Sequence, residues 1–324
     1  MNQRKLSEAA GQEAAAPPMK FSNPTWTAKG EQRAVVAFNG LTTLWFNTGT
    51  LCNITCTNCY IESSPKNDAL VYLTRAEVRT FLDQAKSAAV RPREIAFTGG
   101  EPFMNPEIIG MLDDSLAAKF KVLVLTNAMK PMQHHTSKLL KLNARYPGQL
   151  SIRVSIDHYD RAKHEQVRGP KTWPPAIDGV IWLSTNGFDL ALAGRKLWHE
   201  TDAQLRAGYA RVFGGLGVKI DTSDPSRLIL FPEMDAHADV PEISVGCWAI
   251  LNKRPGDVMC ATSRMIIKRR GASAPLVISC TLLPYDSAFE LGATLAEAAR
   301  PVSLNHRHCA KFCVLGGASC SAPK

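Results

Sequence analysis

Apolar blocks of two lengths alternate along the middle of the chain. Short, mostly apolar runs predict strands at 43–47, 94–98, 121–126, 190–194 and 227–231, and a further strand is expected over 149–157. Longer stretches with apolar residues at helical spacing lie between them, at 74–88, 105–119, 132–146, 175–186 and 201–217. This alternation is typical of parallel strands covered by helices, and both an open sheet and a barrel fit it.

Residue types at the helix starts agree with these boundaries. Thr74 and Glu77 have the spacing of a capping box, in which each side chain accepts a hydrogen bond from the other residue's backbone. Thr201 or Asp202 is a suitable N-cap for the last of these helices, and Pro106 suits the first position of the second.

Polar motifs follow four of the predicted strands. They are a cysteine loop, a Gly-Gly-Glu-Pro turn, a Thr-Asn pair and a Ser-Ile-Asp end, with the residues Cys52 to Cys59, Gly99, Gly100, Glu101, Pro102, Thr126, Asn127, Ser155 and Asp157. The carboxyl ends of parallel strands meet at one edge, where such folds bind ligands. The sequence therefore predicts one site that all four motifs share.

Cys52, Cys56 and Cys59 have the spacing C-x3-C-x2-C directly after the first of these strands. Three close thiolates hold three corners of a cubane iron–sulfur cluster and leave its fourth iron open to another ligand. The alternative from the residues alone is a zinc ion that takes a fourth ligand from elsewhere.

The pattern changes after about residue 240, where six of the nine cysteines lie. Two short apolar runs, 265–268 and 276–278, surround an Arg-Arg-Gly turn and predict a hairpin, with a short helix expected over 288–299. We therefore expect three parts: a disordered tail over 1–34, a core over 35–239 and a cysteine-rich module over 240–324.

Composition and charge narrow the class of protein. The 324 residues are 45% hydrophobic, which allows a large core, and the net charge of +9 is scattered, which favours a solvated surface over a nucleic-acid site. No apolar run reaches the ~18 residues of a membrane span, and the N-terminal segment lacks the apolar region of a secretory signal. We expect a cytoplasmic protein, in which clustered cysteines are ligands rather than disulfides.

With these motifs in view, residues 43–231 resemble the radical S-adenosylmethionine (SAM) superfamily. The resemblance implies a partial (β/α)6 TIM-like barrel, a [4Fe–4S] cluster held by the three cysteines, and SAM as the ligand of the open iron. One departure is that the residue before the third cysteine, commonly aromatic in the family, is Asn58, and the aromatic residue is Tyr60. This puts the details of adenine packing in doubt and leaves the cluster loop unaffected.

The resemblance also implies how SAM is held. Backbone carbonyls at Gly99 and Gly100 and the Glu101 carboxylate suit its ammonium group, Arg168 suits its carboxylate, and Ser155 or Asp157 suits its ribose. Pro102, Thr126, Asn127 and Tyr60 complete the predicted binding residues. On the plainer interpretation, Ser155 and Asp157 cap the following segment and Arg168 forms a surface ion pair.

The cysteine-rich end resembles the SPASM or twitch extensions of the same superfamily, which implies an auxiliary [4Fe–4S] cluster. Six cysteines suffice for one such cluster and are too few for two with four cysteines each. The predicted ligands are Cys260, Cys280, Cys313 and Cys320, with Cys309 next and Cys247 last. A structural zinc site is the alternative, since His306 and His308 flank Cys309, and buried free thiols are another.

The function implied is reductive cleavage of SAM to a 5′-deoxyadenosyl radical that abstracts a hydrogen atom from the substrate. The substrate is expected to be a peptide undergoing maturation or a small metabolite, and the electron donor a flavodoxin or ferredoxin. The competing hypothesis is a non-catalytic zinc or iron–sulfur protein that serves in binding or electron transfer.

Overall fold

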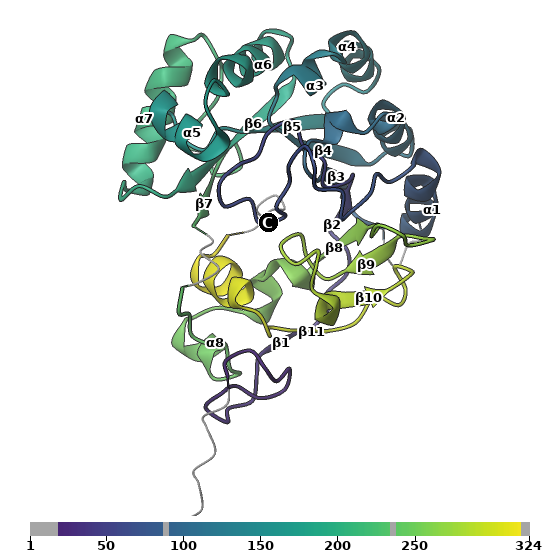
Figure 1. Ribbon diagram of the computed structural model, residues 1–324, viewed down its shortest axis with the longest axis vertical. Coiled ribbons are helices and arrows are strands. Elements are labelled where there is room, and N and C mark those ends of the chain that lie inside the picture. Colours follow the sequence, from purple (N-terminus) through teal and green to yellow (C-terminus); the bar gives the residue numbers. More distant parts are fainter. Residues whose placement is uncertain (1–18, 87–90, 234–237, 319–324) are drawn as a thin grey trace, which may run out of the picture.

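The computed structural model describes residues 19–86, 91–233 and 238–318. Six parallel strands lie side by side in chain order within one nine-stranded sheet (Figure 1). They are β2 (Thr43–Asn47), β3 (Glu94–Thr98), β4 (Lys121–Thr126), β5 (Leu150–Ser155), β6 (Asp189–Lys196) and β7 (Leu228–Pro232). The prediction of a parallel sheet is confirmed, and the sheet forms an open arc with its edges at β7 and β10, in keeping with a partial barrel.

Helices cover the outer side of this arc (Figure 1). They are α1 (Arg75–Ala85), α2 (Ile108–Ala117), α3 (Lys130–Gln133), α4 (Thr136–Arg145), α5 (Arg161–Arg168), α6 (Trp173–Thr185) and α7 (Asp202–Gly215). Both capping boxes form as the local sequence requires, at Thr74 with Glu77 and at Thr201 with Gln204.

The C-terminal hairpin extends the same sheet. β8 (Ser263–Ile267) pairs in parallel with β2, and β9 (Leu276–Ile278) and β10 (Glu290–Gly292) follow as antiparallel strands. The predicted hairpin is confirmed, but it is joined to the core by backbone hydrogen bonds. A division of the chain at residue 240 stays a prediction.

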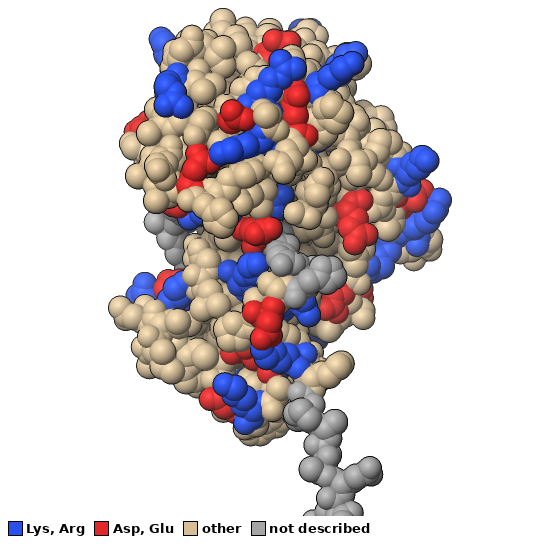
Figure 2. All heavy atoms as spheres, turned by 60° about the vertical axis from the view of Figure 1, so that its left-hand side comes forward, with Lys and Arg blue, Asp and Glu red and all other residues tan. Residues whose placement is uncertain are grey.

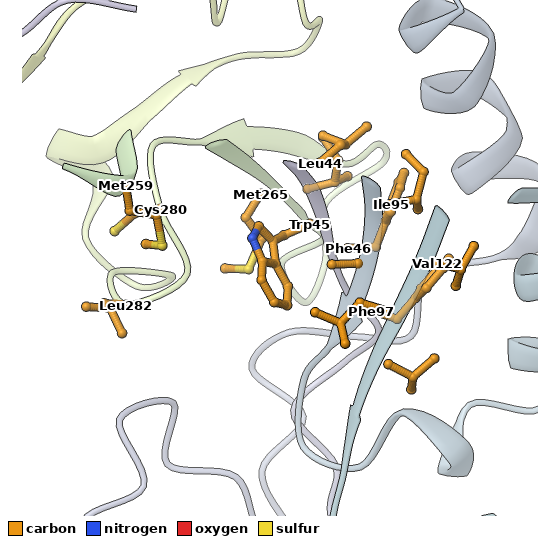
Figure 3. Packing of buried hydrophobic residues seen from close by; sticks show 14 of the residues in the cluster. Leu44, Trp45, Phe46, Ile95, Phe97, Val122, Met259, Met265, Cys280 and Leu282 are labelled. Atoms are coloured by element: carbon orange, nitrogen blue, oxygen red, sulfur yellow. The ribbon is translucent and has the colours of Figure 1, made fainter. Parts of the chain in front are cut away.

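The core lies where the two parts of the sheet meet. Phe46 and Phe97 stack at a centroid distance of 5.5 Å, and Trp45 lies beside Met265 of β8, all of them buried (Figure 3). Burial of Trp45 and Phe46 on β2 and of Met265 and Ile266 on β8 makes this junction part of one continuous hydrophobic core.

Three helix predictions differ from the structure. Residues 288–299 form a 3-10 turn, η4 (Ser287–Phe289), and then β10, because Glu290 pairs with β9 and Gly292 has a φ of +124° that no helix accepts. The helix expected over 132–146 is interrupted between α3 and α4. Pro106 precedes the helix it was expected to begin, because the Asn105 side chain accepts from the Glu107 N–H and holds a turn before Ile108.

Residues 19–34, assigned from the sequence to a disordered tail, are packed against the C-terminal part, while 1–18 lie outside the described residues. Arg33 and Glu242 form a buried ion pair at 2.5 Å, and β1 (Val35–Val36) pairs with β11 (Val302–Ser303). A short helix, α8 (Cys247–Ile250), and the 3-10 turns η2 (Pro255–Asp257) and η3 (Met259–Ala261) lead to β8.

Acidic and basic side chains are interspersed over the face drawn in Figure 2. This agrees with the scattered charge read from the sequence and with a solvated surface. In the described part of the chain, no helix is both long and apolar enough to span a bilayer.

Candidate active site

A cavity of about 180 Å³ lies where the carboxyl ends of the parallel strands meet. Its lining brings together most of the residues that the sequence predicted for SAM and the first cluster, namely Cys52, Cys56, Cys59, Tyr60, Gly99, Gly100, Thr126, Asn127, Ser155, Asp157 and Arg168. Glu101 and Pro102 are buried close by but do not line it. Four motifs that are far apart in sequence therefore share one space.

The cysteine loop is closed and anchored by its backbone. The N–H of Cys52 donates to the carbonyl of Ser64 at 3.1 Å, and the N–H of Thr57 donates to the carbonyl of Val167 at 2.7 Å. Asn58, which replaces the aromatic residue common in the family, has a φ of +61°, a left-handed conformation that Asn tolerates better than most residues. The loop is thus bound to the backbone at Ser64 and to α5.

Burial keeps the thiols of Cys52 and Cys56 protonated until a cation binds them. Burial raises the pKa of the Cys52 thiol to about 12. Burial also raises the pKa of Cys56, against the opposing positive charge of Arg168. Thiolates here require a positive partner, which an iron centre supplies when it binds and displaces the protons.

Gly99 and Gly100 seat the cysteine loop on β3. A Cβ built on Gly99, whose φ is +142°, would lie 2.5 Å from the carbonyl oxygen of Gly49, and one on Gly100 would lie 2.2 Å from that of Leu51. The glycine pair predicted space for a ligand at this turn. The chain's own backbone fills it, so these glycines position the thiols.

Glu101 joins the ends of β3 and β4. Its buried carboxylate accepts hydrogen bonds from the Thr126 hydroxyl at 2.8 Å and from the Asn127 and Phe103 N–H groups at 2.8 and 3.2 Å. Burial raises its pKa to about 7. The carboxylate is therefore engaged within the protein, and Pro102 begins a buried 3-10 turn, η1 (Pro102–Met104), directly after it.

Asn127 links β4 to the cysteine loop. Its Nδ2 donates to Oδ1 of Asn53 at 2.8 Å and lies 4.0 Å from the sulfur of Cys52. This amide fixes the direction of the first thiol from a neighbouring strand.

Asp157 and Arg168 form a buried ion pair within the cavity, with Nε 2.8 Å from Oδ2. Arg168 is the last residue of α5, a helix that the sequence analysis did not predict. Burial alone would lower the pKa of Arg168, but the facing charges of Asp157 and Cys56 raise it above its ordinary value. The guanidinium is permanently charged and held in one direction, and the interpretation as a surface pair does not fit its burial.

The thiols of the first loop suit a cluster with several metal ions better than a single ion. Within residues 19–86, 91–233 and 238–318, no three His, Cys, Asp or Glu side chains converge on one point. A cubane takes one thiolate on each of three irons, so it needs thiols spread around a common space. Three cysteines on the wall of one cavity, with backbone and charged groups opposite, meet that requirement.

A second group of thiols surrounds a small cavity of about 20 Å³ at the end of the hairpin. Its lining includes Cys260, Cys280, Cys309 and Cys313. Figure 3 shows Cys280 beside Met259, with Leu282 close by. Burial raises the pKa of Cys260 to about 12, and that of Cys309 well above its ordinary value, in both cases with help from Cys280.

The remaining C-terminal candidates lie elsewhere or outside the described residues. Cys320 belongs to the latter group. Cys247 lies in α8, where its sulfur accepts from the Ser244 N–H at 3.4 Å, and it does not line the second cavity. His308 does line it, and burial lowers the pKa of this imidazole to about 4, so the ring is neutral and able to ligate.

Sequence reasoning missed several groups that line the main cavity, among them Arg153, Arg195, Phe231, Leu282 and Phe312. Arg195 directly follows the strand predicted to end at Gly194, so the rule that found the other motifs applies to it as well. Phe312 lies in η5 (Cys309–Leu315) and stacks on Phe231 at 5.6 Å, a contact that no local pattern indicates.

Known proteins resemble this chain in sequence and in fold. It is 29% identical over 192 residues to the antilisterial bacteriocin subtilosin biosynthesis protein AlbA of Bacillus subtilis (strain 168), which covers 57% of this chain and 41% of AlbA. In structure it is similar to Streptococcus suis SuiB, with a TM-score of 0.53 and 13% identity over 76% of this chain and 62% of SuiB.

A second structural neighbour is native anSMEcpe with bound AdoMet, with a TM-score of 0.57 and 13% identity over 82% of this chain and 81% of the other. At such identities these structures show the fold alone. The chain spans less than two thirds of the length of AlbA and of SuiB. Residues 46–201, which include the three cysteines and most of the residues that line the strand-end cavity, match the model of the radical SAM superfamily and form a radical SAM domain.

Proposed function

We propose that this chain is a radical SAM enzyme that modifies a peptide. The observation that carries the proposal is the shared cavity, in which three thiols, the Gly99–Gly100 turn and the Asp157–Arg168 pair face one another. A [4Fe–4S] cluster bound there supplies the electron that splits SAM into methionine and a 5′-deoxyadenosyl radical, which takes a hydrogen atom from the substrate.

The residues of the cavity have distinct roles in this proposal. Cys52, Cys56 and Cys59 hold the cluster, and the backbone of the Gly99–Gly100 turn borders the space that SAM needs. Arg168 presents a fixed positive charge for the SAM carboxylate, with Asp157 as the residue that orients it. Ser155, Tyr60, Thr126 and Asn127 complete the wall.

A peptide substrate is favoured over a small metabolite. AlbA is named for the biosynthesis of a bacteriocin, and one SuiB structure, which matches this chain with a TM-score of 0.52, contains its precursor peptide SuiA. We infer that the peptide reaches the cavity from the side lined by Leu282, Phe231 and Phe312. An electron donor of the flavodoxin or ferredoxin class completes the reaction, and a reducing cytoplasm suits the free thiols.

We also propose an auxiliary [4Fe–4S] cluster held by Cys260, Cys280, Cys309 and Cys313. Four thiols on the wall of one cavity support it. The buried Arg264 gives further support: its guanidinium donates to the carbonyls of Cys260 at 2.6 Å, Ala298 at 2.9 Å and Arg300 at 3.0 Å.

Among the described residues, no carboxylate lies within ion-pair distance of Arg264. Burial lowers the pKa of this arginine to about 10, and the thiols of Cys260 and Cys280 oppose that shift. A buried cation costs free energy unless an anion faces it, so the charge of Arg264 near Cys260 and Cys280 favours the thiolate form of these two groups and hence a thiolate-ligated centre.

Anaerobic reconstitution tests the proposal. The wild-type chain should bind about eight irons, as two cubane clusters require, and should release 5′-deoxyadenosine when dithionite and SAM are added. Cys56→Ala should retain about four irons and release none. A fully loaded wild-type protein that releases no 5′-deoxyadenosine would favour the binding or electron-transfer alternative. If the protein holds four irons and a zinc ion, the second site is a zinc site and the auxiliary cluster is not formed.

A further inference from the structure

Arg195 lines the main cavity and has no role in the function proposed above. It is the last residue but one of β6, pairs with Phe231 of β7 and lines the cavity together with Asp157 and Arg168. Its own N–H donates to the carbonyl of Asp157 at 3.0 Å, which fixes its backbone beside the ion pair.

The charges around the cavity leave Arg195 in excess. Three arginines and one aspartate are the charged residues of its described lining. Asp157 is paired with Arg168, and Arg153 is buried deeper, where its charge acts on the carboxyl of Glu94. Within the described residues, the Arg195 side chain has neither an ion pair nor a side-chain hydrogen bond, although its charge reaches Cys56 and opposes the rise in that thiol's pKa.

The surroundings of Arg195 increase the benefit of an anionic ligand. Phe231, which pairs with Arg195, lines the cavity together with Pro232 and Phe312, so a bound peptide would exclude water from the guanidinium. A desolvated arginine is costly without a partner, and its planar donor fork matches a carboxylate in a bidentate arrangement.

Hydrogen bonds within the protein hold the loop after Arg195 in place without a ligand. Glu200 accepts hydrogen bonds from Tyr159 at 2.5 Å and Lys163 at 2.6 Å, and its other close neighbour is Nε2 of His158 at 2.8 Å. His158 and Tyr159 lie between β5 and α5, and Lys163 lies on α5, so the loop between β6 and α7 is anchored to the helix that carries Arg168 and to the segment before it. A preorganised cation binds at a smaller entropic cost than a mobile one.

We propose that Arg195 binds a carboxylate of the peptide substrate, and that the substrate therefore has an acidic residue beside the position that reacts. This inference rests on the proposed peptide modification and adds the chemical class of the peptide. The SAM carboxylate is the other possible source of the same chemistry, but Arg168 already provides for it from within a buried ion pair.

Two pools of acetylated, amidated nonapeptides test this assignment. Random neutral residues surround a central Glu in one pool and a central Gln in the other. Binding to the reconstituted, SAM-loaded protein is measured by equilibrium dialysis and mass spectrometry without reductant, so that no turnover is needed. The wild type should prefer the Glu pool by about tenfold or more, and Arg195→Gln should lose that preference.

Lys196→Gln is the matched control. It removes the same charge one residue further along, from a side chain that pairs with Asp202 and does not line the cavity, so the preference should persist. Arg195→Glu tests whether misfolding explains a lost preference. This variant should prefer a third pool with a central Lys, and a misfolded protein cannot gain such a preference.

Binding of labelled SAM is measured in parallel and should be unchanged in Arg195→Gln. A wild type without preference, or an Arg195→Gln variant that keeps it, overturns the inference. A tenfold loss of SAM affinity in that variant also overturns it, because the carboxylate is then that of SAM. A failure of 5′-deoxyadenosine release contradicts the proposed enzyme separately and leaves the peptide preference measurable.

Discussion

The carboxylate of Glu101 accepts a hydrogen bond of 2.8 Å from the hydroxyl of Thr126, across the ends of β3 and β4. This contact binds two of the motifs that border the cavity to each other. It also buries an ionisable group completely, with consequences for stability.

Glu101 should make the folded protein less stable as the pH rises. Burial raises its pKa from the ordinary 4.5 to about 7, so between these values the folded state holds a proton that the unfolded chain releases. The contribution of this proton to the free energy of unfolding, up to about 3 kcal/mol, is complete below pH 4.5 and is lost as the pH rises through about 7. Urea denaturation at pH 5, 6, 7 and 8 measures it.

Glu101→Gln is the reference for that measurement. The variant keeps the size of the side chain and cannot titrate, so its stability should fall less steeply with pH than that of the wild type. Parallel curves for the two proteins over pH 5–8 would show that the carboxyl is already ionised at pH 5.

Gly100→Ala should displace the cysteine loop. The new methyl group would lie 2.2 Å from the Leu51 carbonyl oxygen, so either the loop or β3 must move, at a cost of about 1–3 kcal/mol. The iron content should fall by the equivalent of the first cluster. Gly214→Ala is the control, because its methyl group meets nothing within 4 Å in α7 and should slightly stabilise that helix. Full iron loading of Gly100→Ala would contradict the packing.

Cys309→Ala and Cys247→Ala should differ in the iron that they retain. Cys309 lines the second cavity with three other thiols, whereas Cys247 contacts Ser244 in α8. We expect loss of about four irons per chain in the first variant and none in the second. Mössbauer or EPR spectra of both variants would identify which cluster is affected, and loss of iron from Cys247→Ala would change the ligand set.

Glu200→Gln should weaken the anchor of the loop that carries Arg195. Burial opposes ionisation of this carboxyl, but hydrogen bonds from Lys163, Tyr159 and His158 hold its pKa at about 2, so it is charged at neutral pH. Loss of the charge should lower the free energy of unfolding by about 1–2 kcal/mol and reduce the preference for acidic peptides. Tyr159→Phe, which removes a single donor, should have a smaller effect on both measurements.

The central strands were predictable because their signals are local. β2, β3 and β4 begin and end at the residues expected, since short apolar runs there are bounded by polar motifs. Thr74 and Thr201 also marked helix starts correctly, because a capping box involves residues only three positions apart.

What the sequence did not reveal depends on contacts between distant segments. β10 forms because Glu290 meets β9, although residues 288–299 have helical spacing. Glu101 was expected to face the ligand, but a donor from the next strand draws its carboxylate inward. Phe312 comes from the C-terminal segment, lines the cavity and stacks on Phe231 of β7, a contact that no local pattern indicates. Spacing alone likewise gave no means of ranking Cys309 against Cys320.

The pairing of β8 with β2 has a consequence for attempts to dissect the chain. Thr43 lies opposite Ser263 and Phe46 opposite Ile266, so a truncation near residue 240 would expose one whole side of β2. That side carries unpaired backbone groups next to the buried rings of Trp45 and Phe46, the combination that recruits strands from other chains. The radical SAM domain expressed without its C-terminal strands should therefore aggregate, and a minimal catalytic fragment of this protein must include the hairpin.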